Sequence, residues 1–351
     1  MTKHKVIPML TTNVRGNNNP GDTFIGVGMQ WLWEYALEDT INWFLISKYG
    51  QADIEKHLDI VKRAGLLVYG GMPQYNNYND WKFWHDDEFW SEIINPNKIP
   101  VAIMAGGSGY PDASMSPMQF AEYCANDELT AHLIKQRAKH ALCFTTRDEH
   151  SHELLNKLSI PNDYLACSAT FASRYCGHDY EQKPYIGLVP PSPKSLPGKY
   201  CGENKDDFVV KEWLKLLHTL RHEGLEPKIV CHWQYEYDLF KDVLSDKSLF
   251  YSNDFNAYLN FYGRCHTVVS ARLHGVLPAF GIPGTKAMGV SIDTRGHAVT
   301  YFDKIPAIPY DQFNTENIMS ILPTLKPSEE SDFTEVIDKY KTIILDAYSK
   351  I

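Results

Sequence analysis

The segment 267–283 constrains the fold of this chain more than any other stretch. A β-branched run from Thr267 to Ser270 ends in a turn that carries Arg272 and His274, and an apolar pattern with helical spacing follows. A strand that passes into a helix in this way is the unit from which α/β proteins are built. The carboxyl end of the strand opens a crevice, where the start of the helix offers unpaired N–H groups to a ligand. We therefore expect Arg272 and His274 to lie where an anion and a proton can be handled together.

Strand-like and helix-like patterns alternate along the whole chain. Strands are expected at 5–10, 64–71, 100–109, 141–146, 185–189, 228–231, 267–270 and 287–292. Helices are expected at 22–36, 119–140, 149–158, 208–223, 235–244, 255–263 and 333–350. The alternation restarts after residues 172–184, and a length of 351 residues exceeds the roughly 250 to 300 at which a single core stops growing.

These patterns predict an α/β protein in which two Rossmann-like domains face each other across a ligand cleft, which is the GT-B architecture. The first domain is expected at 1–175, the second at 180–325, and an amphipathic closing helix at 330–351. A single doubly wound sheet of nine strands is the alternative.

Composition narrows the classes of partner. The net charge is −9, so general attraction to nucleic acid or to an anionic bilayer is not expected. Seven scattered cysteines without zinc-ligand spacing indicate a reduced cytoplasmic chain without a metal site. The N-terminal apolar run is broken by Pro8 and reads as a strand rather than a signal peptide, and no run of ~18 apolar residues predicts a transmembrane segment.

Several turns at expected strand ends carry candidate ligand residues. The sequence Asn-Pro-Gly-Asp at 19–22 contains Asn19 and Asp22, and Asp22 either faces the ligand or only caps the next helix. The strands ending at Gly71 and at Gly107-Ser108 allow backbone N–H groups to approach a ligand, although turn formation alone also explains such glycines.

Two further groups of residues have both a functional and a structural interpretation. Tyr75, Trp81 and Trp84 lie in the aromatic, amide-rich segment 72–90, which suits a sugar but is also explained by a loop anchored through its rings. Arg147 ends the strand 141–146 and can bind an anion or pair with Asp148.

A last pair follows the strand 287–292. Arg295 and His297 face either the same crevice as Arg272 or the solvent.

Taken together, these motifs resemble those of the polysaccharide pyruvyl transferase family. The matching pieces are Asn-Pro-Gly-Asp at 19–22, the glycine-ended strands at 70–71 and 106–107, Thr-Arg-Asp-Glu-His-Ser at 146–151, Ser-Ala-Arg-Leu-His-Gly at 270–275 and Gly-Ile-Pro at 281–283. The chain departs from the family at 166–170, where many members have Cys-Pro or Asp-Pro, and at Pro278, which falls inside an expected helix.

The resemblance implies transfer of a pyruvyl group from phosphoenolpyruvate to two hydroxyls of a sugar, forming a cyclic ketal and releasing phosphate. It implies a role in exopolysaccharide or capsule biosynthesis, with no cofactor besides the donor substrate. It leaves open whether the acceptor is a lipid-linked precursor, reached by peripheral contact at the inner membrane face.

Roles follow for the candidate residues under this resemblance. His274 is the expected acid and Asp22 the expected base. The expected donor-binding residues, chiefly on the second domain, are Arg272, Arg147, Gly275, Ser270, Arg295 and His297. The expected acceptor-binding residues, on the first domain, are Asn19, Gly71, Gly107, Ser108, Tyr75, Trp81 and Trp84. His274 is otherwise a structural histidine that donates to a backbone carbonyl.

Two other functions use the same cleft. A GT-B glycosyltransferase would hold a nucleotide-sugar diphosphate with these arginines, although no acidic ribose-binding position is evident in the second half. A non-catalytic carbohydrate-binding protein would keep the fold without the chemistry.

Overall fold

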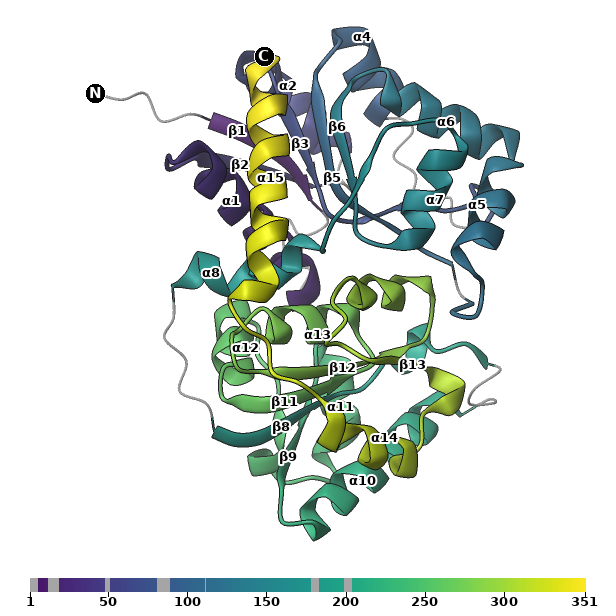
Figure 1. Cartoon of the computed structure of the whole chain (residues 1–351), viewed down its shortest axis with the longest axis vertical. Coiled ribbons are helices and arrows are strands. Elements are labelled where there is room, and N and C mark those ends of the chain that lie inside the picture. Colours follow the sequence, from purple (N-terminus) through teal and green to yellow (C-terminus); the bar gives the residue numbers. More distant parts are fainter. Residues whose placement is uncertain are drawn as a thin grey trace.

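The computed structural model describes residues 6–11, 19–47, 51–80, 89–110, 112–177, 183–198 and 204–351. These residues form two parallel sheets, stacked along the long axis of the molecule with helices on their faces (Figure 1). Trp81 and Trp84 of the aromatic segment lie outside the described residues. None of the helices in the described ranges is both long and apolar enough to cross a bilayer.

The first sheet belongs to the N-terminal half. Its strand order is β2 (Asn42–Ser47), β1 (Val6–Thr11), β3 (Leu67–Gly70), β5 (Val101–Ser108), β6 (Ala141–Thr146) and β7 (Asp163–Tyr164), and the short β4 (Pro73–Tyr75) also pairs with β5. Every pairing is parallel, so each strand returns through a crossover. The order reverses between β1 and β3, which makes their carboxyl ends a topological switch point.

The second sheet has the strand order of a dinucleotide-binding Rossmann domain. Its strands are β10 (Leu249–Phe250), β9 (Glu226–Val230), β8 (Lys183–Val189), β11 (Cys265–Ser270), β12 (Lys286–Ser291) and β13 (Ala307–Pro309). All pairings are again parallel, and the switch point lies between β8 and β11. Two Rossmann-like sheets in one chain give the GT-B arrangement expected from the sequence.

Helices follow the strands. In the first half they are α1 (Pro20–Leu37), α2 (Gln51–Ala64), the π-turn Trp90–Ile94 with α4 (Asn95–Asn97), α5 (Pro117–Ala125), α6 (Glu128–Ala138), α7 (Glu149–Lys157) and, after the 3₁₀ turn Ser168–Phe171, α8 (Ala172–Cys176). In the second half they are α10 (Lys205–His222), α11 (Gln234–Lys241), α12 (Phe255–Tyr262), α13 (Leu273–Phe280), the 3₁₀ segment Thr294–Tyr301, α14 (Thr315–Ile321) and α15 (Ser331–Ser349).

One local expectation was wrong in detail, and one of the two alternatives for Asp22 is excluded. The single helix expected at 119–140 is two helices, because Asp127 accepts a hydrogen bond from the Thr130 amide at 2.9 Å and so caps the start of α6. Asp22 does not cap α1: the side chain of Asn19 accepts from the Gly21 amide at 3.1 Å, and Pro20 occupies the first helical position. Asp22 therefore lies in the first turn of the helix.

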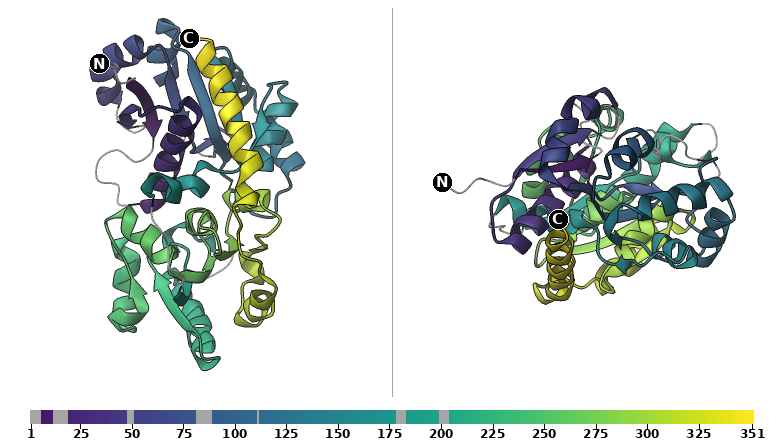
Figure 2. Two further views of the ribbon diagram at one scale, coloured as in Figure 1. Left: turned by 60° about the vertical axis from the view of Figure 1, so that its left-hand side comes forward. Right: turned by 90° about the horizontal axis from the view of Figure 1, so that it is seen from above.

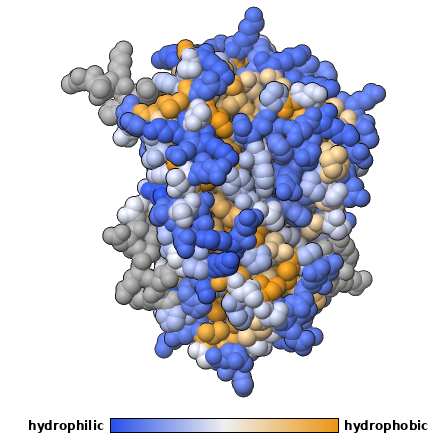
Figure 3. Space-filling model, viewed as in Figure 1, coloured by the Kyte–Doolittle hydropathy of each residue, from blue (hydrophilic) through white to orange (hydrophobic). Residues whose placement is uncertain are grey.

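One hydrophobic core spans both halves, beside one core within each half. Helix α1 covers one face of the first sheet and packs on α12 and α13 of the second half, so that Phe24 contacts the rings of Tyr258 and Tyr262. Helix α15 leaves the second half and runs back along α1, as the yellow helix of Figures 1 and 2 shows, and the Tyr340 hydroxyl donates to the Ala166 carbonyl at 2.8 Å. In Figure 3, apolar residues reach the surface of this face in separate patches among hydrophilic ones.

Candidate active site

A cleft of about 280 Å³ lies between the two halves. Asn19, Asp22, Pro73 and Arg147 line it from the first half, and the segments that follow β8, β9, β11 and β12 line it from the second. Both switch points therefore open into the same space, as expected for a ligand site in facing α/β sheets.

Arg147 is a buried cation that the described residues do not neutralise. Its side chain is fully buried, and its Nε and Nη2 have no hydrogen-bond partner within the described ranges. The described residues show no ion pair between it and Asp148, whose carboxylate instead accepts from the Ser151 amide at 2.8 Å and from the Ser108 amide at 2.8 Å. Burying a guanidinium without an anion is costly, so Arg147 is prepared for an anionic ligand.

Gly107 leaves the space that the side chain of Arg147 occupies. A Cβ at Gly107 would overlap the guanidinium at Nε, so only glycine leaves room for the side chain there. Its amide donates to the Met72 carbonyl at 3.0 Å and is not offered to a ligand. Gly107 thus acts through Arg147 and does not line the cleft, contrary to the acceptor-binding role expected for it.

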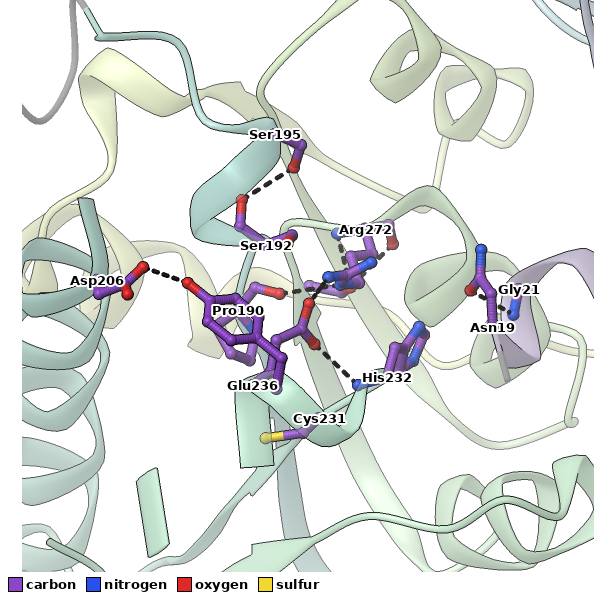
Figure 4. A network of polar contacts seen from close by, with 12 residues as sticks. Asn19, Gly21, Pro190, Ser192, Ser195, Asp206, Cys231, His232, Glu236 and Arg272 are labelled. Atoms are coloured by element: carbon purple, nitrogen blue, oxygen red, sulfur yellow. Dashed lines mark hydrogen bonds and ion pairs between the residues drawn. The ribbon is translucent and has the colours of Figure 1, made fainter. Parts of the chain in front are cut away.

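Arg272 lines the cleft, but a buried carboxylate holds it. Its Nη2 forms an ion pair with Glu236, and its Nε donates to the Pro190 carbonyl at 3.2 Å (Figure 4). Glu236, whose side chain is 1% exposed, also accepts from the backbone amide of His232 at 3.0 Å. Ser270 fixes the turn, because its Oγ accepts from the Arg272 amide at 3.0 Å and donates to the Arg272 carbonyl at 2.8 Å. Arg272 is therefore a preoriented cation whose charge is already balanced.

His274 lies against the start of α1. A Cβ on Gly21 would be 2.9 Å from His274 Nδ1, and His274 Nε2 is buried without a hydrogen-bond partner among the described residues. Burial lowers the pKa of His274 well below 6.5, and Arg147, Arg295 and Arg272 lower it further. The imidazole is therefore neutral at pH 7 while the cleft holds no anion, and the structure shows no backbone carbonyl accepting from its Nε2.

The third arginine of the cleft is also paired. Arg295 Nε lies 3.0 Å from both oxygens of Asp293, which raises the pKa of the guanidinium, and the nearby Asp22 raises it as well. Asp22 thus lines the cleft beside this cation.

Helix starts from both halves meet at the cleft. The first turns of α1 and α13 are in contact through Gly21 and His274, and both helices direct their N-terminal ends toward the cleft residues Asn19 and Arg272. The positive ends of two helix dipoles favour an anion between them.

Five further candidates lie outside the cleft. Gly71 packs against Ile25 of α1, and Tyr75 is buried in the core against Gly106. A Cβ on Gly275 would overlap Ser270 Oγ, so Gly275 serves the close packing of α13 on β11. The other two, Ser108 and His297, join the halves instead: Ser108 Oγ donates to Thr294 Oγ1 at 3.1 Å, and His297 Nε2 lies 2.9 Å from the Ala113 carbonyl oxygen.

The structure adds four residues that the sequence patterns did not single out. Glu236 and Asp293 are the carboxylate partners of two arginines, and Ser192 and His232 line the cleft. His232 is the second residue after β9, so the strand-end argument applied to Arg147 would have found it. No sequence signal identifies Glu236, because its partner Arg272 follows a different strand and the two residues meet only in the folded chain.

Comparisons with known proteins agree with this arrangement. The UDP-GlcNAc 2-epimerase of Methanocaldococcus jannaschii superposes with a TM-score of 0.50 at 9% identity, covering 91% of this chain and 92% of that one. A protein assigned as a UDP-N-acetylglucosamine 2-epimerase from Listeria monocytogenes gives 0.53 at 12% identity, covering 97% and 91%. At these identities the likeness concerns the fold alone.

Sequence comparison identifies the family. No curated protein sequence matches the chain significantly. The family model described as polysaccharide pyruvyl transferase matches residues 27–281, which include Arg147, Glu236, Arg272 and His274. This match spans more than half of the chain, and the chain therefore belongs to the polysaccharide pyruvyl transferase family, whose members are transferases that act on polysaccharides.

Proposed function

We propose that this protein transfers the pyruvyl group of phosphoenolpyruvate to two hydroxyls of one sugar, in a polysaccharide or its lipid-linked precursor, forming a cyclic ketal and releasing phosphate. The observation that carries the proposal is the buried, unneutralised guanidinium of Arg147 in a cleft with His274. Phosphoenolpyruvate presents a phosphate and a carboxylate on a three-carbon unit, and both anionic groups fit a small cleft lined by arginines.

The charges of the cleft suggest how the donor is held. Of its three arginines, Arg272 is balanced by Glu236 and Arg295 by Asp293, whereas Arg147 is balanced by no carboxylate among the described residues. Arg147 is therefore the principal anion-binding residue of the proposal. Arg272 keeps its Nη1 for the ligand, because Glu236 and Pro190 engage Nη2 and Nε.

The chemistry balances without an additional cofactor. Protonation of the enol CH₂ carbon produces the methyl group and a cationic centre at the neighbouring carbon, to which one sugar hydroxyl adds. The bond from that carbon to the phosphate oxygen then breaks, and the second hydroxyl adds to close the ketal. The two hydroxyl protons end on the methyl carbon and on the phosphate.

Two residues supply the proton transfers in this proposal. His274 delivers the proton to carbon once the bound donor has offset the positive charge around it. Asp22, on the first turn of α1, accepts a proton from an acceptor hydroxyl. The two lie on helices that touch at Gly21, so acid and base face one ligand from opposite halves.

Donor binding is the first test. Phosphoenolpyruvate at a hundred times its Kd should stabilise the wild-type protein by about 2.7 kcal/mol in a thermal titration. Arg147→Met should lose most of this stabilisation, because the variant removes the unneutralised cation while keeping a long side chain. Arg264→Gln is the matched control, since Arg264 is an exposed arginine remote from the cleft lining.

The same titration separates the alternatives. Stabilisation by a nucleotide sugar but not by phosphoenolpyruvate would reject the proposal in favour of a glycosyltransferase. If sugars bind and phosphate is never released from phosphoenolpyruvate across a panel of acceptor glycosides, the protein is a carbohydrate-binding member of the fold.

A further inference from the structure

His232 is the second residue after β9 and lines the same cleft as Arg272. The residue is 1% exposed and belongs to the cleft lining. The backbone amide of His232 is fixed by Glu236, the same carboxylate that holds Arg272 (Figure 4). His232 and Arg272 are therefore oriented as one unit, although the proposed reaction assigns no task to the histidine.

Tyr262 of helix α12 holds the imidazole ring of His232 through a hydrogen bond. His232 Nε2 lies 2.8 Å from the hydroxyl of Tyr262, which is fully buried and has no other hydrogen-bond partner within the described residues. If Nε2 carried the proton, the phenolic O–H would be buried without an acceptor, at a cost of about 1–3 kcal/mol. The hydroxyl of Tyr262 therefore donates to Nε2.

This hydrogen bond determines the tautomer. Burial lowers the pKa of His232 well below 6.5, and Arg272 and His274 lower it further, so the ring is neutral. A neutral imidazole that accepts at Nε2 carries its proton on Nδ1. Nδ1 has no hydrogen-bond partner among the described residues and is the ring nitrogen left for a ligand.

We propose that His232 is a donor-binding residue, held by Tyr262 in the Nδ1–H tautomer so that it donates a hydrogen bond to an anionic oxygen of the ligand beside Arg272. Tyr262 is its positioning residue. The inference rests on the proposed function for the identity of the ligand. A neutral N–H donor binds an oxygen anion without adding positive charge to the three arginines of the cleft. A fourth cation there would oppose the protonation of His274 further.

The tautomer is tested by long-range ¹H–¹⁵N NMR of the histidine rings, with His232→Gln used to assign the signals. In the wild-type protein, His232 should show a protonated Nδ1 and an unprotonated Nε2. Tyr262→Phe should shift the ring toward the other tautomer. Tyr258→Phe is the matched control, because its hydroxyl, on the same helix, donates to the Cys231 carbonyl at 2.6 Å and not to His232. A proton on Nε2 in the wild-type protein would overturn the inference.

Ligand binding is tested in the same spectra by adding phosphoenolpyruvate, inorganic phosphate or pyruvate separately. At least one of these anions should move the Nδ1 signal of His232, and the one that does identifies the group bound there. If anions shift the His274 signals and leave His232 Nδ1 unchanged, the inference fails. If phosphate or pyruvate moves Nδ1 but no acceptor supports phosphate release, the inference stands and the proposed reaction fails.

Kinetics give a second readout. Tyr262→Phe should raise the KM for phosphoenolpyruvate about tenfold with kcat changed little, since a uniform binding contact is lost. Tyr258→Phe should leave both constants near the wild-type values. An equal loss of kcat in the two variants would indicate a structural effect only.

Discussion

At the scale of the residue, His274 is neutral in the cleft, whereas the proposed chemistry needs it as an acid. Burial and three arginines hold its pKa well below 6.5, so at pH 7 the ring in the free protein is neutral rather than an imidazolium acid. Under the proposed function, a bound trianionic donor would reverse the balance of charge around His274 and raise its pKa. The acid of the proposed reaction would then be formed by substrate binding rather than present beforehand.

This coupling predicts that donor binding takes up protons. Calorimetric titration with phosphoenolpyruvate at pH 7, in buffers with different ionisation enthalpies, should show uptake of up to about one proton per site. His274→Gln should bind the donor with little uptake. Proton release in the wild-type protein, or equal uptake in the variant, would contradict the assignment of His274 as the acid.

Single residues could be predicted from the sequence where they end a strand. Arg147, Arg272, His274 and Arg295 were all found by that argument, and the structure brings them to one cleft. Their charge state could not be predicted, because it depends on Glu236 and other carboxylates that reach the arginines only after folding. Glycines were the weakest guide, since a glycine needed for packing looks the same in sequence as one needed for a ligand.

At the scale of the element, α1 is the central helix, because it contacts the first sheet, α13 and α15 together. Gly28 allows α1 to pack closely on the 3₁₀ turn Ser168–Phe171 as well, since a Cβ at this position would overlap the backbone carbonyl of Ser168. The segment 166–170, where the chain departs from its family, is thus packed directly on α1. Ser168 Oγ also donates to the Ile25 carbonyl at 3.0 Å.

Gly28→Ala should therefore destabilise the protein by about 1–3 kcal/mol, as overpacking against rigid backbone does. Urea unfolding of the two proteins gives the difference. Gly198→Ala is the control, because a Cβ at that position meets nothing within 4 Å, and its effect should stay within about 0.5 kcal/mol. Equal effects of the two changes would show that α1 can move away from Ser168 without cost.

Pro278 also belongs to this scale. It lies inside α13 and removes the helical hydrogen bond that an amide at this position would give to the carbonyl of His274. The helix continues to Phe280, and the Gly281 amide still donates to the Leu277 carbonyl at 2.9 Å. The sequence patterns predicted the helix correctly. They could not show that the carbonyl left without its helical hydrogen bond is that of His274, the candidate acid.

At the scale of the whole molecule, Thr294 joins the two halves at the edge of the cleft. It is buried, its amide donates to the Tyr110 carbonyl at 3.1 Å, and its Oγ1 accepts from the Tyr110 amide at 2.9 Å. Ser108 and His297, expected to bind ligands, belong to the same interface. The sequence predicted two facing domains, but contacts between residues so distant in the chain follow only from the assembled fold.

Thr294→Val keeps the shape of the side chain and removes only the hydrogen bonds of Oγ1, leaving the Tyr110 amide and Ser108 Oγ without this partner. Hydrogen–deuterium exchange of the segment around Tyr110 should become about tenfold faster. This corresponds to a decrease of about 1.4 kcal/mol in the free energy of local opening. Thr342→Val should not change this exchange, because Thr342 Oγ1 bonds only the Asp338 carbonyl within α15. Unchanged exchange in Thr294→Val would mean that other contacts hold the halves closed.

The return of α15 to the first half also affects synthesis of the chain on the ribosome. The strands of the first sheet are translated before the second half begins, yet the helix that covers α1 is translated after every strand of both sheets. At about 5–20 residues per second, α15 is translated on the order of ten seconds after the first half is complete. The half that is translated first is therefore completed last, and during that interval the apolar face of α1 that α15 later covers is exposed to solvent.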